Sequence, residues 1–249
     1  MTAPSTALPW PDGPRLDPRR CAWFEDSGTV VVADLHLGYA WSRRTRGALL
    51  PVETPDDTLE RLEALHRDYA PRRWVILGDI VHEALDLPAI ERALRDLCGR
   101  ITHGSELIFC LGNHDRHLEK RLKDWNLPVQ CHRQFEIGGI QLLHGDAPLN
   151  STPEETFTLG KTDPAPARCM LGHEHPAITL GDGVATRVKC PAFLVGDRAI
   201  ILPAFSAWAA GCEWKRQPFL GPIARSARFH TAFACAGTRL LPVPLGSVR

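Results

Sequence analysis

The chain has 249 residues, 44% of them hydrophobic and 23% charged, a composition that excludes an intrinsically disordered protein. Lys plus Arg and Asp plus Glu both number 29, so the formal net charge is zero and no overall field draws the protein to nucleic acid or to an anionic membrane. Any binding of a polyanion must therefore depend on a local cluster of charge.

The N-terminal segment, residues 1–20, contains Pro and Asp where a secretory signal needs an apolar core. No apolar run reaches the ~20 residues needed to cross a bilayer, so we expect a cytoplasmic protein with no membrane contact. Residues 1–249 are expected to form a single domain with an irregular segment at 1–20, although the length alone also permits two small domains. The eight cysteines include no C-x-x-C pair, which indicates reduced thiols, with Cys110 and Cys169 in the core.

A repeated unit organises the sequence, in which a short apolar run ends in a polar turn that contains Asp, Asn or His. Five such runs follow in chain order: Thr29 to Ala33, Trp74 to Leu77, Leu107 to Leu111, Ile140 to Leu143 and Cys169 to Leu171. Continuous apolar runs of this length are typical of strands that are buried on both faces. The turns that follow them are Asp34-Leu35-His36, Gly78-Asp79, Gly112-Asn113-His114-Asp115, His144-Gly145-Asp146 and Gly172-His173-Glu174-His175.

Two amphipathic helices are predicted between the early strands. The first spans Thr54 to Tyr69, with Thr54 or Asp57 as its N-cap, and the second spans Leu87 to Leu97 and ends at Gly99. Strands that alternate with helices predict a mostly parallel sheet with right-handed crossovers.

Helical periodicity fades after Ile137. Three shorter runs, Val184 to Val188, Ala199 to Leu202 and Phe229 to Ala234, predict a second and more antiparallel sheet, so the fold class is an α/β sandwich. Ligands of open α/β sheets bind beyond the carboxyl ends of the strands, which is where all five polar turns fall. We therefore expect these turns to converge.

The polar turns contain metal-ligating side chains and no thiolate. Carboxylate, imidazole and amide ligands suit Mn, Fe, Zn or Ni. Two carboxylates and four histidines are more ligands than a single ion can use if one of its coordination positions stays open for substrate. Two divalent ions are therefore expected. Ions roughly 4 Å apart need a bridging carboxylate, for which Asp79 is the natural candidate. The expected ligands are Asp34, His36, Asp79, Asn113, His144, His173 and His175.

The ordered series of these motifs resembles the signature of the calcineurin-like metallophosphoesterases from Asp34 to His175, more than half of the chain. The resemblance implies a four-layer α/β/β/α sandwich with two mixed sheets and flanking helices. It also implies in-line attack on phosphorus by a hydroxide that bridges the metals. His114 would be the general acid or a charge stabiliser, and Asp115 the group that orients His114. One implied metal set is Asp34, His36, Asp79 and His175, and the other is Asp79, Asn113, His144 and His173.

A narrower resemblance is to the ligase-associated DNA damage response endonucleases of the PdeM type. It is carried by Asp34-Leu35-His36-Leu37-Gly38-Tyr39, Gly78-Asp79-Ile80-Val81-His82, Gly172-His173-Glu174-His175-Pro176 and Leu202-Pro203-Ala204-Phe205. This resemblance implies manganese-dependent cleavage of DNA in repair, with DNA ligase or helicase partners. The alternatives are a phosphodiesterase or pyrophosphatase of small nucleotides, and a metal-bound scaffold in a repair complex. The sequence predicts no oligomeric state.

Substrate contacts are expected from residues near the first two turns. Arg43, Arg44 and Arg46 are candidates for phosphate binding, since guanidinium groups make paired contacts with phosphate, although a run of arginines is also typical of a solvated face. His82 is a candidate for the pocket wall, and Glu83 beside it equally suits a helix N-terminus.

Aromatic side chains offer a further way to bind nucleic acid. Trp41, Trp208 and Trp214 could stack on bases, but tryptophans near apolar runs more often belong to the core. The segment Pro203 to Trp214 could likewise form an exposed apolar patch, and burial against the second sheet is the favoured interpretation.

Overall fold

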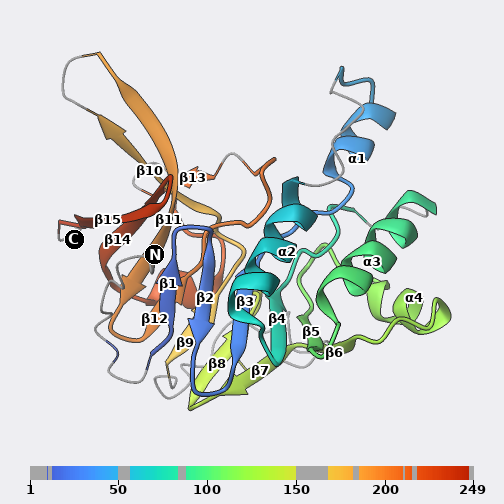
Figure 1. Ribbon diagram of the computed structural model, residues 1–249. Helices are drawn as coiled ribbons and strands as arrows, with labels where there is room; N and C mark the ends of the chain where they lie inside the picture. Colours follow the sequence, from blue (N-terminus) through green and yellow to red (C-terminus); the bar gives the residue numbers. More distant parts are fainter. Residues whose placement is uncertain are drawn as a thin grey trace.

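The computed structural model describes residues 10, 13–49, 57–83, 88–149, 168–181, 185–209, 211–214 and 218–246. Within these residues the chain forms two sheets that pack face to face, with helices on the outer sides (Figure 1). None of the described helices is both long and apolar enough to cross a membrane.

The first sheet has the strand order β1-β2-β3-β4-β5-β6. Strands β3 to β6 are parallel, and β1 and β2 add an antiparallel edge. The strands are β1 (Arg15–Asp17), β2 (Cys21–Phe24), β3 (Thr29–Ala33), β4 (Arg73–Leu77), β5 (Glu106–Cys110) and β6 (Gln130–His132). The prediction of an irregular segment at 1–20 is wrong at β1, because Leu16 is an apolar residue that packs between the sheets.

The second sheet has the order β13-β10-β11-β12-β9-β8-β7, with β14 and β15 joined to it through β11. Strands β8, β9 and β12 run parallel, and most other pairs are antiparallel, as predicted. The strands are β7 (Gln134–Ile137), β8 (Ile140–Leu143), β9 (Cys169–Leu171), β10 (Pro176–Gly181), β11 (Arg187–Gly196), β12 (Ala199–Ile201), β13 (Cys212–Glu213), β14 (Phe229–Ala236) and β15 (Arg239–Pro244).

Helices cover the outer faces unequally. Among the described residues, α2, α3 and α4 pack on the first sheet, whereas only the short α5 packs on the outer face of the second. The helices are α1 (Tyr39–Thr45), α2 (Asp57–Tyr69), α3 (Pro88–Ile101), α4 (Leu118–Asp124) and α5 (Pro222–Ser226). The α/β sandwich with two mixed sheets is therefore confirmed, with a thin fourth layer.

The bounds of two predicted helices need comment. Thr54 and Leu87, the predicted first residues, lie outside the described part of the chain. Gly99 does not end α3, because the helix continues to Ile101, whose fully buried side chain draws the last turn onto the core. A buried aliphatic side chain contributes about 1.5–3 kcal/mol, more than the ~1 kcal/mol that a helical glycine costs.

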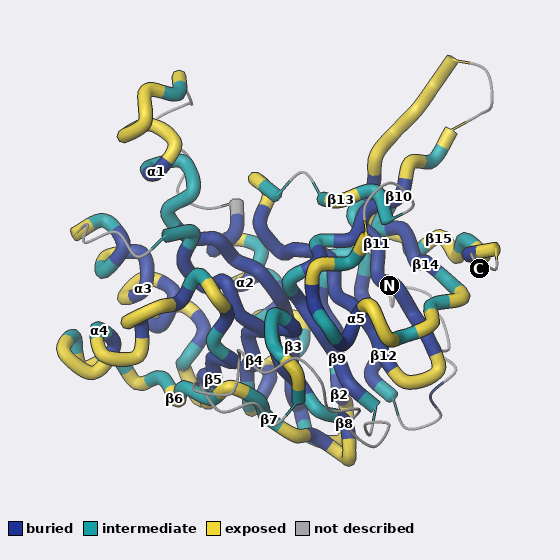
Figure 2. Tube along the Cα trace, turned by 180° about the vertical axis from the view of Figure 1, so that it is seen from behind, coloured by how far each residue is buried: buried dark blue, intermediate teal, exposed yellow. Residues whose placement is uncertain are grey.

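The central strands are buried on both faces, which explains their continuous apolar runs. In β3, Val30 and Val32 face the helices, whereas Val31 and Ala33 face the second sheet. The register aligns Val31 with Val75 of the neighbouring strand, and β3, β4 and β5 end at the same edge. Figure 2 shows this buried interior as continuous dark strands, while α1 and the far ends of β10 and β11 project from it as exposed segments.

Candidate metal centre and active site

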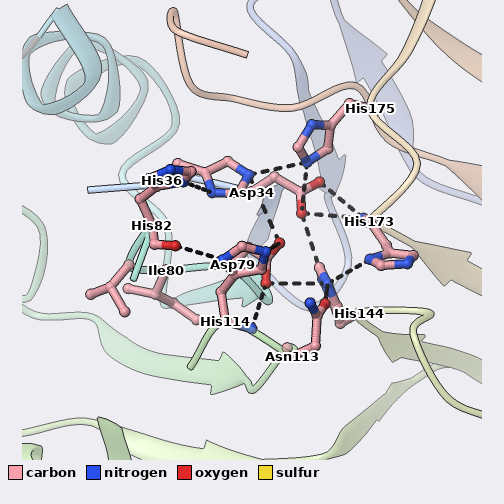
Figure 3. A network of polar contacts seen from close by, with 12 residues as sticks. Asp34, His36, Asp79, Ile80, His82, Asn113, His114, His144, His173 and His175 are labelled. Atoms are coloured by element: carbon pink, nitrogen blue, oxygen red, sulfur yellow. Dashed lines mark hydrogen bonds and ion pairs between the residues drawn. The ribbon is translucent and has the colours of Figure 1, made fainter. Parts of the chain in front are cut away.

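The loops after β3, β4, β5, β8 and β9 meet at one edge of the sandwich, so the predicted convergence is confirmed (Figure 3). Two groups of ligand atoms form there, each with its atoms within 4.8 Å of one another. The first group is Asp34, His36, Asp79 and His175, and the second is Asp79, His144 and His173.

Asp79 is common to both groups and directs one oxygen to each. Its Oδ2 lies 3.8 Å from Nε2 of His36, and its Oδ1 lies 3.3 Å from Nε2 of His144. The amide oxygen of Asn113 joins the second group, 3.2 Å from the same His144 nitrogen. This is the arrangement expected of a carboxylate that bridges two cations.

Imidazole nitrogens face one another at both groups. Nε2 of His36 lies 3.2 Å from Nε2 of His175, and Nδ1 of His173 lies 3.1 Å from Nε2 of His144. Among the described residues, Asp34 and Asp79 form ion pairs with histidine side chains alone. A buried set of oxygen and imidazole donors directed at common points fits divalent cations.

Backbone strain is concentrated in the ligand loops. Five of the predicted ligands have a positive φ, in the left-handed region that costs about 1–3 kcal/mol for a residue other than glycine. They are Asp34 (56°), His36 (47°), Asp79 (45°), His173 (68°) and His175 (45°). Such strain persists where the surrounding fold holds a functional conformation.

Glycines let the loops approach the ligands closely. A Cβ on Gly78 would lie 2.1 Å from Nδ1 of His144, and Gly78 also has a φ of +65°. A Cβ on Gly172 would lie 3.0 Å from an oxygen of Asp34. The glycines of the motifs therefore provide the space in which the ligands sit.

Comparison with known families identifies this site. Residues 29–187 match the model of the calcineurin-like phosphoesterase family. The chain belongs to that family. This calcineurin-like phosphoesterase is therefore a metal-dependent hydrolase of phosphoesters, as its motifs predict.

Solved structures support the fold. The phosphoesterase superposes on nuclease MPE of Pseudomonas putida with a TM-score of 0.69 and 20% sequence identity, over 97% of this chain and 100% of that chain. At this identity the likeness concerns the fold. No curated protein matches the sequence.

The charge states of the ligand residues follow from burial and from their neighbours. Burial lowers the pKa of His36 to about 3, which keeps its imidazole neutral and able to ligate. Burial alone would raise the pKa of Asp34, but the nearby His175 and His144 outweigh it, and the net pKa of the carboxyl is lowered. Both groups are thus unprotonated near neutral pH, the state that a cation requires.

His114 of the phosphoesterase is oriented by a backbone group. Its Nδ1 lies 2.5 Å from the carbonyl oxygen of His82, which accepts the Nδ1 proton. Its Nε2 then faces the centre, 3.9 Å from Oδ2 of Asp79, with the side chain 36% exposed. The ring is therefore fixed at one nitrogen and open at the other (Figure 3).

The predicted role of Asp115 is corrected by the structure. Its carboxylate does not bond the ring of His114 but accepts the backbone N–H groups of Gly112 at 2.8 Å, Ile80 at 2.9 Å and Val81 at 3.2 Å. Asp115 thus ties together the loops after β4 and β5. Burial raises its pKa to about 7, despite the hydrogen bond from Gly112 that favours the charged form.

His82 lies beside the first ligand group. Its Nδ1 is 3.4 Å from Nδ1 of His36, and its ring lies 4.6 Å from that of Tyr39. Tyr39 in turn stacks on Trp208 at 5.9 Å, and Trp208 is 37% exposed. The sequence predicts no role for Tyr39, although this residue ends the motif that runs from Asp34 to Tyr39.

The predicted phosphate-binding arginines differ in their surroundings. Arg43 and Arg44 are exposed on α1, which begins just after His36 and projects from the body of the molecule (Figure 1). Arg46 forms an ion pair with Glu83 at 2.7 Å, so its charge is already partly neutralised. None of the three belongs to the ligand groups, and in the described part of the chain only Arg46 contacts a residue next to the site, through Glu83.

The segment Pro203 to Trp214 is partly buried, with residue 210 outside the described residues. Phe205 is fully buried, and the N–H groups of Phe205 and Ser206 donate to the carbonyls of Ala33 and Asp34. Its start therefore holds the end of β3 in place. Burial is confirmed, but the prediction of burial against the second sheet is wrong at Phe205, which packs in the core of the first sheet and its helices. Trp41 and Trp214 pack against the core as partly buried side chains.

Glu174 is a further residue whose role the sequence did not reveal. Its buried carboxylate accepts the backbone N–H groups of Leu220 at 2.9 Å and Gly221 at 2.6 Å. It thus ties the loop before α5 to the two ligands on either side of it. The only sequence signal was a charged residue between two metal-ligating histidines.

Proposed function

We propose that this phosphoesterase is a binuclear-metal phosphodiesterase that cleaves DNA, acting as an endonuclease in DNA repair. The observation that carries the proposal is the position of Asp79, with one oxygen directed at each ligand group. Asp34, His36, Asp79 and His175 would hold one ion, and Asp79, Asn113, His144 and His173 the other.

The ions would supply Lewis-acid charge for the phosphate and lower the pKa of a water. Manganese is the proposed ion, and Fe, Zn or Ni suit the same ligands. The protein's own residues then have to position the ester and supply a proton to the oxygen that leaves.

His114 is the proposed catalytic acid. The His82 carbonyl holds the proton on Nδ1, so a second proton on the imidazolium form is carried by Nε2, which faces the centre. This proton is in position for transfer to the leaving oxygen of the ester. Asp115 acts at a distance, by holding the two loops that flank His114.

DNA is the proposed substrate for three reasons. The fold is that of nuclease MPE of Pseudomonas putida, the short motifs resemble endonucleases of the PdeM type, and Arg43 and Arg44 are exposed on α1, the helix that begins three residues after His36. Action in the cytoplasm with DNA ligase or helicase partners is proposed from the same motifs. Small nucleotides and a scaffold role are the rivals.

The first experiment is hydrolysis of bis(p-nitrophenyl) phosphate and of the monoester with added manganese. We expect diester cleavage that requires the metal and falls about 100-fold or more in His114→Ala, the range of a lost general acid. His103→Ala, an exposed histidine far from the centre, is the matched control. Metal content is measured in each variant.

The outcomes separate the candidates. No turnover of either ester by a fully metallated wild type would leave the scaffold role. If the diester is cleaved, supercoiled plasmid and single-stranded DNA are tested next as substrates. Efficient cleavage of small nucleotide diesters without cleavage of DNA would favour the small-nucleotide enzyme. Nicking of closed circular plasmid would establish endonuclease action, because a circle offers no ends.

A further inference from the structure

A cavity of about 770 Å³ adjoins the second ligand group. Asn113 and His144 form its inner wall, and the loops after β5, β6 and β8 form the rest. Its volume is in the range of pockets that hold a nucleotide-sized ligand. The proposed chemistry uses only the inner wall, so the remainder of the cavity needs another explanation.

Three cations line this cavity: Arg116, Lys120 and Arg133. Arg116 and Lys120 follow the Asn113 motif, whereas Arg133 lies between β6 and β7. All three side chains are exposed, so each is free to move toward a ligand.

The cations have no acidic partners among the residues that the structure describes. Glu119, on the same wall, pairs with Lys123 at 2.7 Å, and the Asp115 carboxylate is occupied by backbone N–H groups. The remaining acid of the lining is Asp146, beside His144. With Glu119 paired to Lys123, the described lining keeps three cations against Asp115 and Asp146, an excess of one positive charge. Arg46 on α1 differs, because it pairs with Glu83.

We infer that this cavity binds the phosphate of the nucleotide next to the bond that is cut, so that the site selects oligonucleotides over diesters with one phosphate. The inference rests on the proposed function. An oligonucleotide places a second phosphate beside the one at the metal centre, and guanidinium and ammonium groups bind phosphate by charge-assisted hydrogen bonds. Leu111 and Pro148 add an apolar wall on which a sugar or base can rest.

The test compares two triple variants with the same change in charge. R116A/K120A/R133A removes the cations of the cavity, whereas R67A/R72A/R198A removes three exposed arginines at the opposite edge of the sheets. For each protein, kcat/KM is measured on bis(p-nitrophenyl) phosphate, a single-stranded DNA oligonucleotide and ADP-ribose. Binding of a fluorescein-labelled oligonucleotide is measured by anisotropy over a range of salt concentrations.

We expect the ratio of oligonucleotide to diester kcat/KM to fall about 10- to 100-fold in the cavity variant and to stay unchanged in the control, since each exposed ion pair contributes up to ~1 kcal/mol. The slope of log affinity against log salt should decrease by about 0.7, because the cavity variant loses its contact with one phosphate of a single strand. Equal losses on both substrates, or an unchanged ratio, would overturn the inference. So would a loss confined to ADP-ribose, which points to a pyrophosphate ligand.

The anisotropy arm keeps this inference separate from the proposed function. If the wild type cleaves neither ester, the proposed function fails, but oligonucleotide binding that the cavity variant loses and the control keeps would still support the cavity as a nucleic-acid site. If the wild type cleaves the diester and both variants bind the oligonucleotide equally well, the function stands and the inference fails.

Discussion

Gly112→Ala provides a direct test of whether Asp79 must sit where the structure places it. Gly112 has no positive φ, so the effect of the substitution is steric. The added Cβ would lie 2.7 Å from Oδ1 of Asp79 and 2.7 Å from Cδ2 of His144, about 0.7 Å short of the 3.4 Å at which ordinary contact begins. Either the carboxylate or the imidazole must move.

Overpacking of this kind costs about 1–3 kcal/mol. The more specific expectation is loss of the second ion, because Oδ1 of Asp79 and the ring of His144 both belong to that group. Metal stoichiometry by mass spectrometry should fall from two toward one, with diester turnover reduced about 100-fold, since a 1 Å misplacement can cost that much.

Gly99→Ala is the matched control for Gly112→Ala. Gly99 lies in α3, and nothing is within 4 Å of the position that its Cβ would take. Alanine should stabilise the helix by about 0.5–1 kcal/mol and leave metal content unchanged. A Gly112→Ala protein with two bound ions and near wild-type turnover would refute the bridging arrangement.

Three further predictions concern stability and binding. Burial alone would raise the pKa of the Asp17 carboxyl, but hydrogen bonds from Arg19 and Tyr69 outweigh burial and lower this pKa. The stability that Asp17 contributes is therefore fully present above the pKa of the unfolded state and is lost as pH falls through the lower pKa of the folded state. Asp17→Asn should therefore lower the free energy of unfolding by about 1.5–3 kcal/mol at pH 7 in urea titrations, and the difference should vanish in acid. Removal of divalent metal with a chelator should lower Tm, because ligands that bind the folded state stabilise it, and readdition of manganese should restore it. The exposed ring of Trp208 is expected to stack on a base, so Trp208→Ala should weaken oligonucleotide binding, measured by anisotropy, by about 1–3 kcal/mol. The same substitution removes the ring that stacks on Tyr39.

The central strands could be predicted well because their sequence signal is local. The bounds of β3, β8 and β9 agree with the apolar runs, since each strand is largely buried and ends at the polar turn that carries a predicted ligand. Edge strands carry a weaker signal. β1 and β13 have three and two residues, too short for any periodicity, and they are defined by pairing with distant segments.

The ligand residues could be predicted from their types and order, but their partners could not. Asp115 follows His114 in the chain, and adjacency suggested a hydrogen bond between them. In the structure the carboxylate turns toward the N–H groups of Ile80 and Val81, more than thirty residues away. A buried carboxylate takes the donors that the folded backbone offers, and these depend on how two loops pack.

The group that orients His114 illustrates the same limit more sharply. A carbonyl oxygen is present at every residue, so no substitution pattern or motif distinguishes the one at His82 from any other. Its importance comes from the loop after β4, which Asp115 holds through two N–H groups just before His82. Asp115 is therefore linked to the ring of His114 only through the backbone at residues 80–82, a connection that adjacency in the sequence does not reveal.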